Sequence, residues 1–240
     1  MTGRWVVLDV GETIIDETRV WTIWADMLGI SRLTFLAGFG AVLARGGEHR
    51  DVFELFNVAD WRTAWPKHEA IYGGFQPEDL YPDAIPAMAA LREKGYRVAV
   101  IGNQPASRDA QLRRIGIEAE VIAMSEEMGV AKPSQAFFDR ALELLGSPPP
   151  SSVAYVGDRV DNDVLPATVA GMRAVWIRRG PWGFIERLPE GVQPALVVSS
   201  LAVTLLALGA MNSVVVESPP AVYVTSLSGI DPPPKLLSLS

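Results

Sequence analysis

A few polar residues of this 240-residue sequence stand where short apolar segments end, and their types suit anion and metal chemistry. They are Asp9, Gly102 with Asn103, Lys132, Asp158 and Asp163. Clustered carboxylates repel one another unless a cation lies among them, and hard oxygen ligands favour magnesium. A lysine in the same place would neutralise charge on a nucleophile or on a bound anion. Each residue type alone is common, but the set in this order predicts a reactive centre.

The apolar segments in front of these residues have the character of buried parallel strands. They cover residues 6–8, 98–101, 121–122, 153–156 and 174–177. Helical segments such as 83–94 and 134–145 lie between them, and each is followed by a glycine that can end a helix. This alternation predicts an α/β fold with a Rossmann-like, doubly wound parallel sheet. Ligands bind such sheets beyond the carboxyl ends of the strands, so we expect the polar residues to meet there.

The alternation fails between the first two strands, where helical periodicity continues with no convincing strand. We therefore expect an all-helical cap at residues 17–77, inserted into a core formed by residues 1–16 and 78–216. Residues 217–240 carry proline-rich stretches and little pattern, and we treat them as a C-terminal tail. The cap contains four tryptophans that either form its core or line a substrate pocket, and a small helical unit needs most of them for its core. They are Trp21, Trp24, Trp61 and Trp65.

Composition limits the classes of partner. The formal net charge of -7 argues against nucleic-acid binding, which depends on clustered lysine and arginine. A small anionic substrate would need locally placed positive charge or a metal. The sequence has no cysteine, which excludes disulfides and thiolate sites and suits the cytoplasm. We expect a cytoplasmic monomer or homodimer.

One uncharged stretch, residues 195–216, has the length of a membrane span. A buried strand at 196–198, followed by a helix that Ser199 or Ser200 caps, explains the stretch without a membrane. We therefore expect no membrane partner.

Four segments resemble the motifs of the haloacid dehalogenase (HAD)-like hydrolase superfamily, in the branch with a helical (C1) cap. Residues 6–16, VVLDVGETIID, are similar to the first motif, a hydrophobic strand followed by Asp-x-Asp-Gly-Thr-Leu-x-Asp. Residues 98–103 resemble the second motif and Lys132-Pro133 the third. Residues 157–163, GDRVDND, resemble the fourth, Gly-Asp-x-x-x-x-Asp. The resemblance runs from Arg4 to about Leu208.

The resemblance implies a role for each of these residues. Asp9 would be the nucleophile that becomes an aspartyl ester, and Lys132 would neutralise charge on Asp9 and on the transferring group. Magnesium would be held by Asp9, Asp158 and the backbone carbonyl of Gly11, with Asp163 in support. Covalent catalysis of this kind divides one hard displacement into two easier steps. The implied activity is that of a magnesium-dependent phosphatase acting on a small phosphorylated metabolite.

Two glycines depart from the phosphatase pattern. Gly11 stands where phosphatases carry an aspartate that acts as general acid and base, a function worth roughly 10²–10⁴-fold in rate. Gly102 stands where the second motif carries a hydroxyl, so it offers no side chain to phosphate. The resemblance still places the phosphate-binding site at Gly102, Asn103 and Lys132. Glu12 could replace the missing acid, or it could be a turn residue in solvent. Asn103 could bind phosphate through its amide, or it could hold the loop.

These departures leave two alternatives open. Haloacid dehalogenases also lack an acid at the position of Gly11, so hydrolysis of a carbon–halogen bond is the first. They do not need magnesium, however, and the retained Asp158 and Asp163 favour the metal-using phosphatases. The second alternative is a fold that binds a phosphorylated ligand or a protein with little turnover. The presence of Asp9 and Lys132 argues against it.

Overall fold

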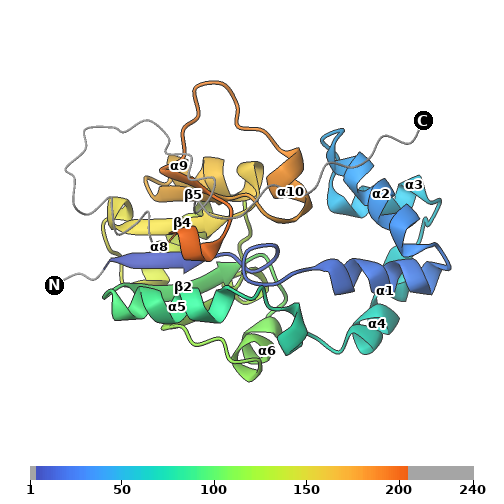
Figure 1. The fold of residues 1–240 in the computed structure, drawn as a ribbon, viewed down its shortest axis with the longest axis horizontal. Helices are drawn as coiled ribbons and strands as arrows, with labels where there is room; N and C mark the ends of the chain where they lie inside the picture. Colours follow the sequence, from blue (N-terminus) through green and yellow to red (C-terminus); the bar gives the residue numbers. More distant parts are fainter. Residues whose placement is uncertain (1–3, 205–240) are drawn as a thin grey trace, which may run out of the picture.

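A six-stranded parallel sheet forms the centre of the computed structural model, which describes residues 4–204 (Figure 1). The strands lie in the order β3-β2-β1-β4-β5-β6. Their bounds are β1 (Trp5–Leu8), β2 (Arg97–Gly102), β3 (Val121–Met124), β4 (Val153–Gly157), β5 (Arg173–Ile177) and β6 (Leu196–Val198). The strand order reverses on either side of β1, which is where open parallel sheets bind ligands. The predicted α/β fold with a doubly wound parallel sheet is confirmed.

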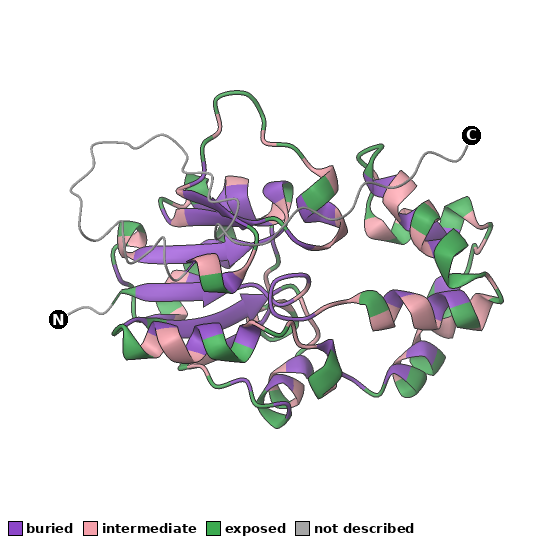
Figure 2. Ribbon diagram, viewed as in Figure 1, coloured by how far each residue is buried: buried purple, intermediate pink, exposed green. Residues whose placement is uncertain are grey.

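Helices cover both faces of this sheet, so the strands are buried on both sides (Figure 2). Alternate residues of β1 illustrate the two layers: Val6 and Leu8 belong to one apolar cluster, and Trp5 and Val7 belong to the other. The first cluster contains side chains of α5 (Ala84–Glu93) and α6 (Arg108–Arg114). The second contains side chains of α8 (Gln135–Leu144) and α9 (Leu165–Val169). Because strand residues alternate in direction, a continuous apolar strand fills both layers at once.

The remaining helical segments of the core are short. They are η2 (Pro77–Asp79), α7 (Ser125–Met128), η3 (Pro150–Ser152), η4 (Val160–Val164) and α10 (Gly180–Ile185). Two of these bear on the site: η4 is a single π-helical turn directly after β4, and α10 follows β5. Single π-helical turns are rare in proteins, and those that occur often lie at functional sites.

The cap leaves the core directly after β1 and lies beyond the arrowheads of the strands (Figure 1). Its elements are α1 (Thr18–Leu28), α2 (Arg32–Leu43), η1 (His49–Asp51), α3 (Val52–Leu55) and α4 (Trp61–Tyr72). The inserted segment is thus helical, as predicted from its periodicity. The domain limits at residues 17 and 77 stay predictions.

Aromatic side chains form the core of the cap. Trp21, Trp24 and Trp61 are buried there, and Trp65 packs against the same cluster. The ring of Trp24 stacks on that of His68 at 4.5 Å between centroids. Trp182 of α10 joins this cluster from the sheet side, with its ring 5.4 Å from that of Phe39. The cap and the core therefore share apolar packing, which helps to fix the cap over the strand ends.

The segment after β5 agrees with the interpretation of the uncharged stretch. Strand β6 is buried, and the hydroxyl of Ser200 accepts a hydrogen bond from the Val203 N–H at 3.3 Å where the next helix begins. The rest of that stretch and residues 217–240 lie outside the described residues. Within residues 4–204, no single helix is long and apolar enough to cross a membrane, and the α1–α2 pair that reaches the length is bent by 117°.

Candidate active site

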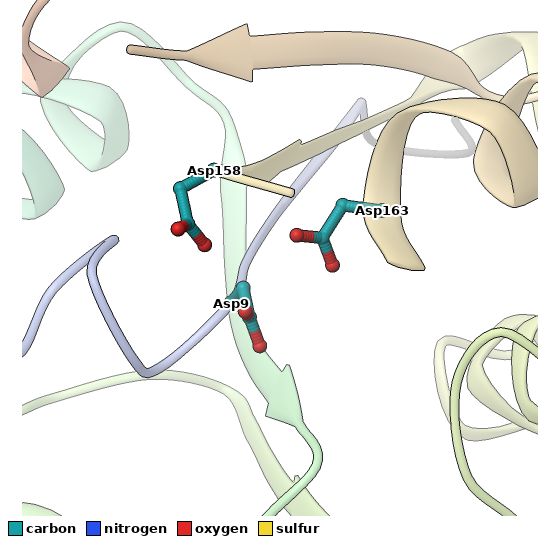
Figure 3. Close-up of side chains that lie close together, drawn as sticks. All are labelled: Asp9, Asp158 and Asp163. Carbon is teal, nitrogen blue, oxygen red and sulfur yellow. The ribbon is translucent and has the colours of Figure 1, made fainter. Parts of the chain in front are cut away.

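Three carboxylates converge at the carboxyl edge of the sheet (Figure 3). Asp9 follows β1, Asp158 follows β4, and Asp163 comes from the π-helical turn behind β4. Strands β1 and β4 pair in register, with Leu8 opposite Val156, so the residues that follow them emerge side by side. One oxygen of each carboxylate lies within 4.8 Å of the others. All three residues are buried. Because buried carboxylates repel one another, their burial requires a cation among them.

Lys132 supplies one such cation. Its ammonium lies 2.8 Å from Oδ1 of Asp9 and 2.6 Å from Oδ1 of Asp163, and its side chain is 3% exposed. Burial disfavours the charged ammonium, but the two carboxylates outweigh burial and hold the Lys132 pKa well above its ordinary value. Burial also raises the pKa of Asp163, to about 6, although Lys132 opposes the shift. The structure therefore brings together the predicted nucleophile and the predicted lysine.

Asp158 is the member of the cluster that lacks a partner. Its Oδ2 is buried and has no hydrogen-bond partner within the described chain. Burial, with Asp163 and Asp9 nearby, raises the pKa of Asp158 well above its ordinary value. An orphaned carboxylate oxygen is expensive to bury unless a cation binds it. The oxygens of Asp158 and Asp9 fit a hard divalent ion such as magnesium.

Asp163 differs from the other two because both of its oxygens are occupied. Oδ1 binds Lys132, and Oδ2 accepts the Arg159 N–H at 3.0 Å. This geometry favours the supporting position that was expected for Asp163 over direct metal ligation.

Glu12 does not point into the site as a free acid. Its residue adopts a positive φ of 50°, and its Oε1 accepts the Glu17 N–H at 3.0 Å. Its Oε2 accepts the Tyr81 hydroxyl proton at 2.5 Å. Burial raises the Glu12 pKa to about 7. Glu12 is thus a buried anchor between the first loop, the cap helix α1 and Tyr81, and not a turn residue in solvent.

The second strand end contains Gly102 and Asn103. A side chain on Gly102 would collide with Asp9, because its Cβ would lie 2.5 Å from Oδ1 of that carboxylate. The Asn103 amide accepts the Lys132 N–H at 2.8 Å and donates to the Lys132 carbonyl at 3.0 Å. Asn103 also borders the cavity. These bonds favour the loop-holding role, in which Asn103 positions Lys132, and phosphate binding by Asn103 and Gly102 stays a prediction.

A cavity of about 440 Å³ extends from Asp9, Lys132 and Asp158 toward the cap. The cap side of its wall is aromatic and includes edges of all four cap tryptophans: Trp21, Trp24, Trp61 and Trp65. Arg50, Arg108 and Arg159 add positive charge to the wall. The tryptophans therefore serve both as cap core and as cavity lining.

Glu17 is a cavity residue that the sequence did not reveal. It precedes α1, and its carboxyl group lies against Gly11 in the wall of the cavity. Burial, and then the neighbouring Glu12 and Asp9, raise the Glu17 pKa to about 8. Nothing in the motif spacing marks this residue, because it lies at the first turn of the insertion and outside every motif. Arg108 was also missed, since its only sequence context is an ordinary helix start.

Comparison with protein families places these residues in a known context. A family model described as haloacid dehalogenase-like hydrolase matches residues 4–171. The chain is 38% identical over 122 residues to a glyceraldehyde 3-phosphate phosphatase of Methanopyrus kandleri, covering 50% of this chain and 51% of that protein. It is 32% identical over 170 residues to a phosphoserine phosphatase of Thermus thermophilus, covering 65% and 68%. The match thus spans about half the length of the first relative and about two thirds of the second.

Solved structures share the architecture. A HAD phosphatase from Thermococcus onnurineus superposes with a TM-score of 0.56 and 25% identity, covering 86% of this chain and 98% of that one. An L-2-haloacid dehalogenase from Xanthobacter autotrophicus superposes with a TM-score of 0.63 and 17% identity, covering 87% and 99%. At 17% identity, the similarity to the Xanthobacter structure supports the fold only.

Proposed function

We propose that this chain, which belongs to the haloacid dehalogenase-like hydrolase family, is a magnesium-dependent phosphatase that acts through an aspartyl-phosphate on Asp9. The observation that carries the proposal is the environment of Asp9: its carboxylate is bound by Lys132 and shares a buried cluster with the orphaned oxygen of Asp158. The phosphatase names of the relatives from Methanopyrus and Thermus support the same chemistry.

The first step is a displacement at phosphorus. An Asp9 carboxylate oxygen forms a bond to the phosphorus, and the bond from phosphorus to the leaving oxygen breaks with its electron pair. Lys132 binds and orients the Asp9 carboxylate, and its charge offsets the negative charge of the transferring group. Water then attacks the phosphorus and gives up a proton, and the bond to Asp9 breaks, which releases inorganic phosphate and regenerates the Asp9 carboxylate.

Magnesium, when bound, would neutralise phosphoryl oxygens and help to orient the group for attack. Asp9, Asp158 and the backbone carbonyl of Gly11 would hold the ion. Asp163 would act behind them through Lys132 and the Arg159 backbone, because its oxygens are already engaged.

The cavity supports a small organic phosphate as the substrate. Its core side carries Asp9 and Lys132, and its cap side carries aromatic edges that suit the organic part of a molecule. Lys132 and Arg50 of the wall would favour an anion against the net charge of -7, whereas Arg108 and Arg159 are already paired with carboxylates. Closure of the cap over this cavity would exclude water and select the substrate. A cytoplasmic location, a monomeric or homodimeric state, and the lack of nucleic-acid and membrane partners stay predictions.

Dehalogenation is the weaker alternative. Gly11 is compatible with it, but it leaves the buried, unpartnered Asp158 oxygen without a purpose.

The experiment is hydrolysis of p-nitrophenyl phosphate by the purified full chain, with magnesium or with EDTA. We expect turnover with magnesium that is lost with EDTA, in Asp9→Asn and in Asp158→Asn. Glu54→Asn, an exposed acid of α3, is the control for loss of a carboxylate elsewhere. Turnover that survives both EDTA and Asp9→Asn would refute the proposal, as would release of halide from a 2-haloacid with no release of phosphate.

A further inference from the structure

The carboxyl group of Glu17 fills the space that a side chain on Gly11 would occupy. A Cβ on Gly11 would lie 2.5 Å from Oε1 and 2.9 Å from Cδ of Glu17, and the three nearest heavy atoms to it all belong to Glu17. Gly11 does not have a left-handed φ, so its backbone does not require glycine. In this arrangement, the Glu17 carboxyl occupies the space beside Gly11 that a side chain there would enter.

Glu17 is held in this place by the anchor described above. Its N–H donates to Glu12, whose other oxygen is bound by Tyr81. The start of α1 is thereby tied to the first loop and to the core. The side chains of Trp21 and Gln104 lie close to the Glu17 carboxyl.

Other acids that line the cavity are committed elsewhere. Asp9 is bound by Lys132, and both Glu12 oxygens accept hydrogen bonds. Both oxygens of Glu69 bind Arg108, at 3.1 and 2.9 Å. The remaining acids of the wall are Asp158, which belongs to the buried cluster, and the exposed Glu48, which lies 3.7 Å from Arg159. Glu17 is the one acid of the described cavity wall that adjoins the first loop beside Asp9 and forms no ion pair there.

We propose that Glu17, the residue that precedes α1, is the catalytic acid and base of this chain, in place of a side chain at Gly11. The proposal rests on the proposed phosphatase function. In the first step, the Glu17 carboxylic acid gives its proton to the leaving oxygen as the bond from phosphorus to that oxygen breaks. In the second step, the Glu17 carboxylate takes a proton from water as the water oxygen bonds to phosphorus and the bond to Asp9 breaks. Each turnover returns Glu17 to its starting state.

The test compares two leaving groups of similar size in the full chain with magnesium. Phenolate needs a proton more than p-nitrophenolate does, because phenol is the weaker acid. We expect Glu17→Gln to lower kcat/KM for phenyl phosphate by about 10²–10⁴-fold, and to lower the first turnover of p-nitrophenyl phosphate by about tenfold or less. Loss of the base in the second step should leave a burst of p-nitrophenolate followed by slow turnover.

Matched variants separate catalysis from folding. Asp16→Asn changes the neighbouring acid, whose Oδ1 accepts the Thr18 N–H, and should leave the ratio of the two substrates unchanged. Gly11→Asp should lower activity while Glu17 is present, because the two side chains collide. Glu17→Ala should lose activity. The double variant Glu17→Ala with Gly11→Asp should be at least about tenfold more active than Glu17→Ala alone. That recovery would show that the two positions compete for one space and one function.

Several results would overturn the proposal. An equal decrease for both substrates in Glu17→Gln, with no burst, would show a structural role. Gly11→Asp that activates the enzyme with Glu17 intact would show that the space is not shared. If the wild type turns over, loses activity in Asp9→Asn and is unchanged in Glu17→Gln, the phosphatase function stands and Glu17 fails alone. If the wild type hydrolyses neither ester, both proposals fail together.

Discussion

Replacement of Lys132 by methionine should test how strongly the buried cluster depends on its single ammonium. Methionine has nearly the length of lysine, so the change removes charge with little loss of packing. It leaves Asp9 and Asp163, whose side chains are 10% and 1% exposed, without the group that lies 2.8 and 2.6 Å from them. Removing one partner of a buried ion pair costs about 3–5 kcal/mol of stability. Because one ammonium serves two carboxylates here, we expect about 4–5 kcal/mol at neutral pH.

The loss should depend on pH in a direction that the cluster fixes. The Asp163 pKa is about 6 with Lys132 present, compared with an ordinary 3.8, and removal of Lys132 should raise it further. A raised carboxyl pKa means that the folded state binds the proton more tightly, so stability falls as pH rises from the unfolded to the folded pKa. At about pH 5 the variant should therefore lose only roughly 2 kcal/mol, because the cluster is partly protonated.

The assay is urea unfolding of wild type and Lys132→Met at both pH values, with EDTA present so that no divalent ion replaces the ammonium. Lys67→Met is the control. Lys67 is exposed on α4, and lysine and methionine are both good helix formers, so this change should have little effect on stability. A loss below about 1 kcal/mol at neutral pH would refute the reasoning, because it would be no larger than that of a surface pair. A loss that grows toward low pH would refute the assignment of its cause to ionised carboxylates.

Two further predictions concern groups around the site. Arg179→Met should lower the free energy of unfolding in urea by about 2–3 kcal/mol, because it removes charged hydrogen bonds to Asp83 at 3.0 and 2.6 Å. The control is Arg178→Met, which changes the exposed neighbour and should lower stability less. Equal losses in the two variants would contradict the prediction. Burial raises the Glu12 pKa from 4.5 to about 7, so the stability of the wild type should fall relative to Glu12→Gln by about 3 kcal/mol between about pH 4.5 and 8. Parallel pH profiles of the two proteins would refute this effect.

The sheet could be predicted because its strands are buried on both faces. Val6, Val7 and Leu8 form an unbroken apolar run that ends at Asp9, and similar runs mark the other strands. Parallel strands then place their ends at one edge, so the meeting of Asp9 and Asp158 follows from topology. The strand order was not predicted, since the apolar runs carry no information about which strands are neighbours.

The positions of polar side chains were harder to predict, because they depend on contacts between distant segments. Asn103 is tied to the backbone of Lys132, and Arg179 is buried against Asp83, although each looks like a loop residue in the sequence. The role of Glu12 depends on Tyr81, which is 69 residues away. Spacing within a motif cannot reveal such partners.

Glu17 shows how a gap in a motif can be the consequence of a residue outside it. Considered alone, Gly11 indicates a weakened enzyme, because the usual carboxyl is absent. In the fold, the first loop and the start of α1 lie against each other, and a carboxyl from the second segment fills the space left by the first. On the proposed assignment, the nucleophile follows β1 and the acid stands directly before α1. Any displacement of α1 would separate the two groups, so on this arrangement proton transfer requires the cap to be in place over the substrate.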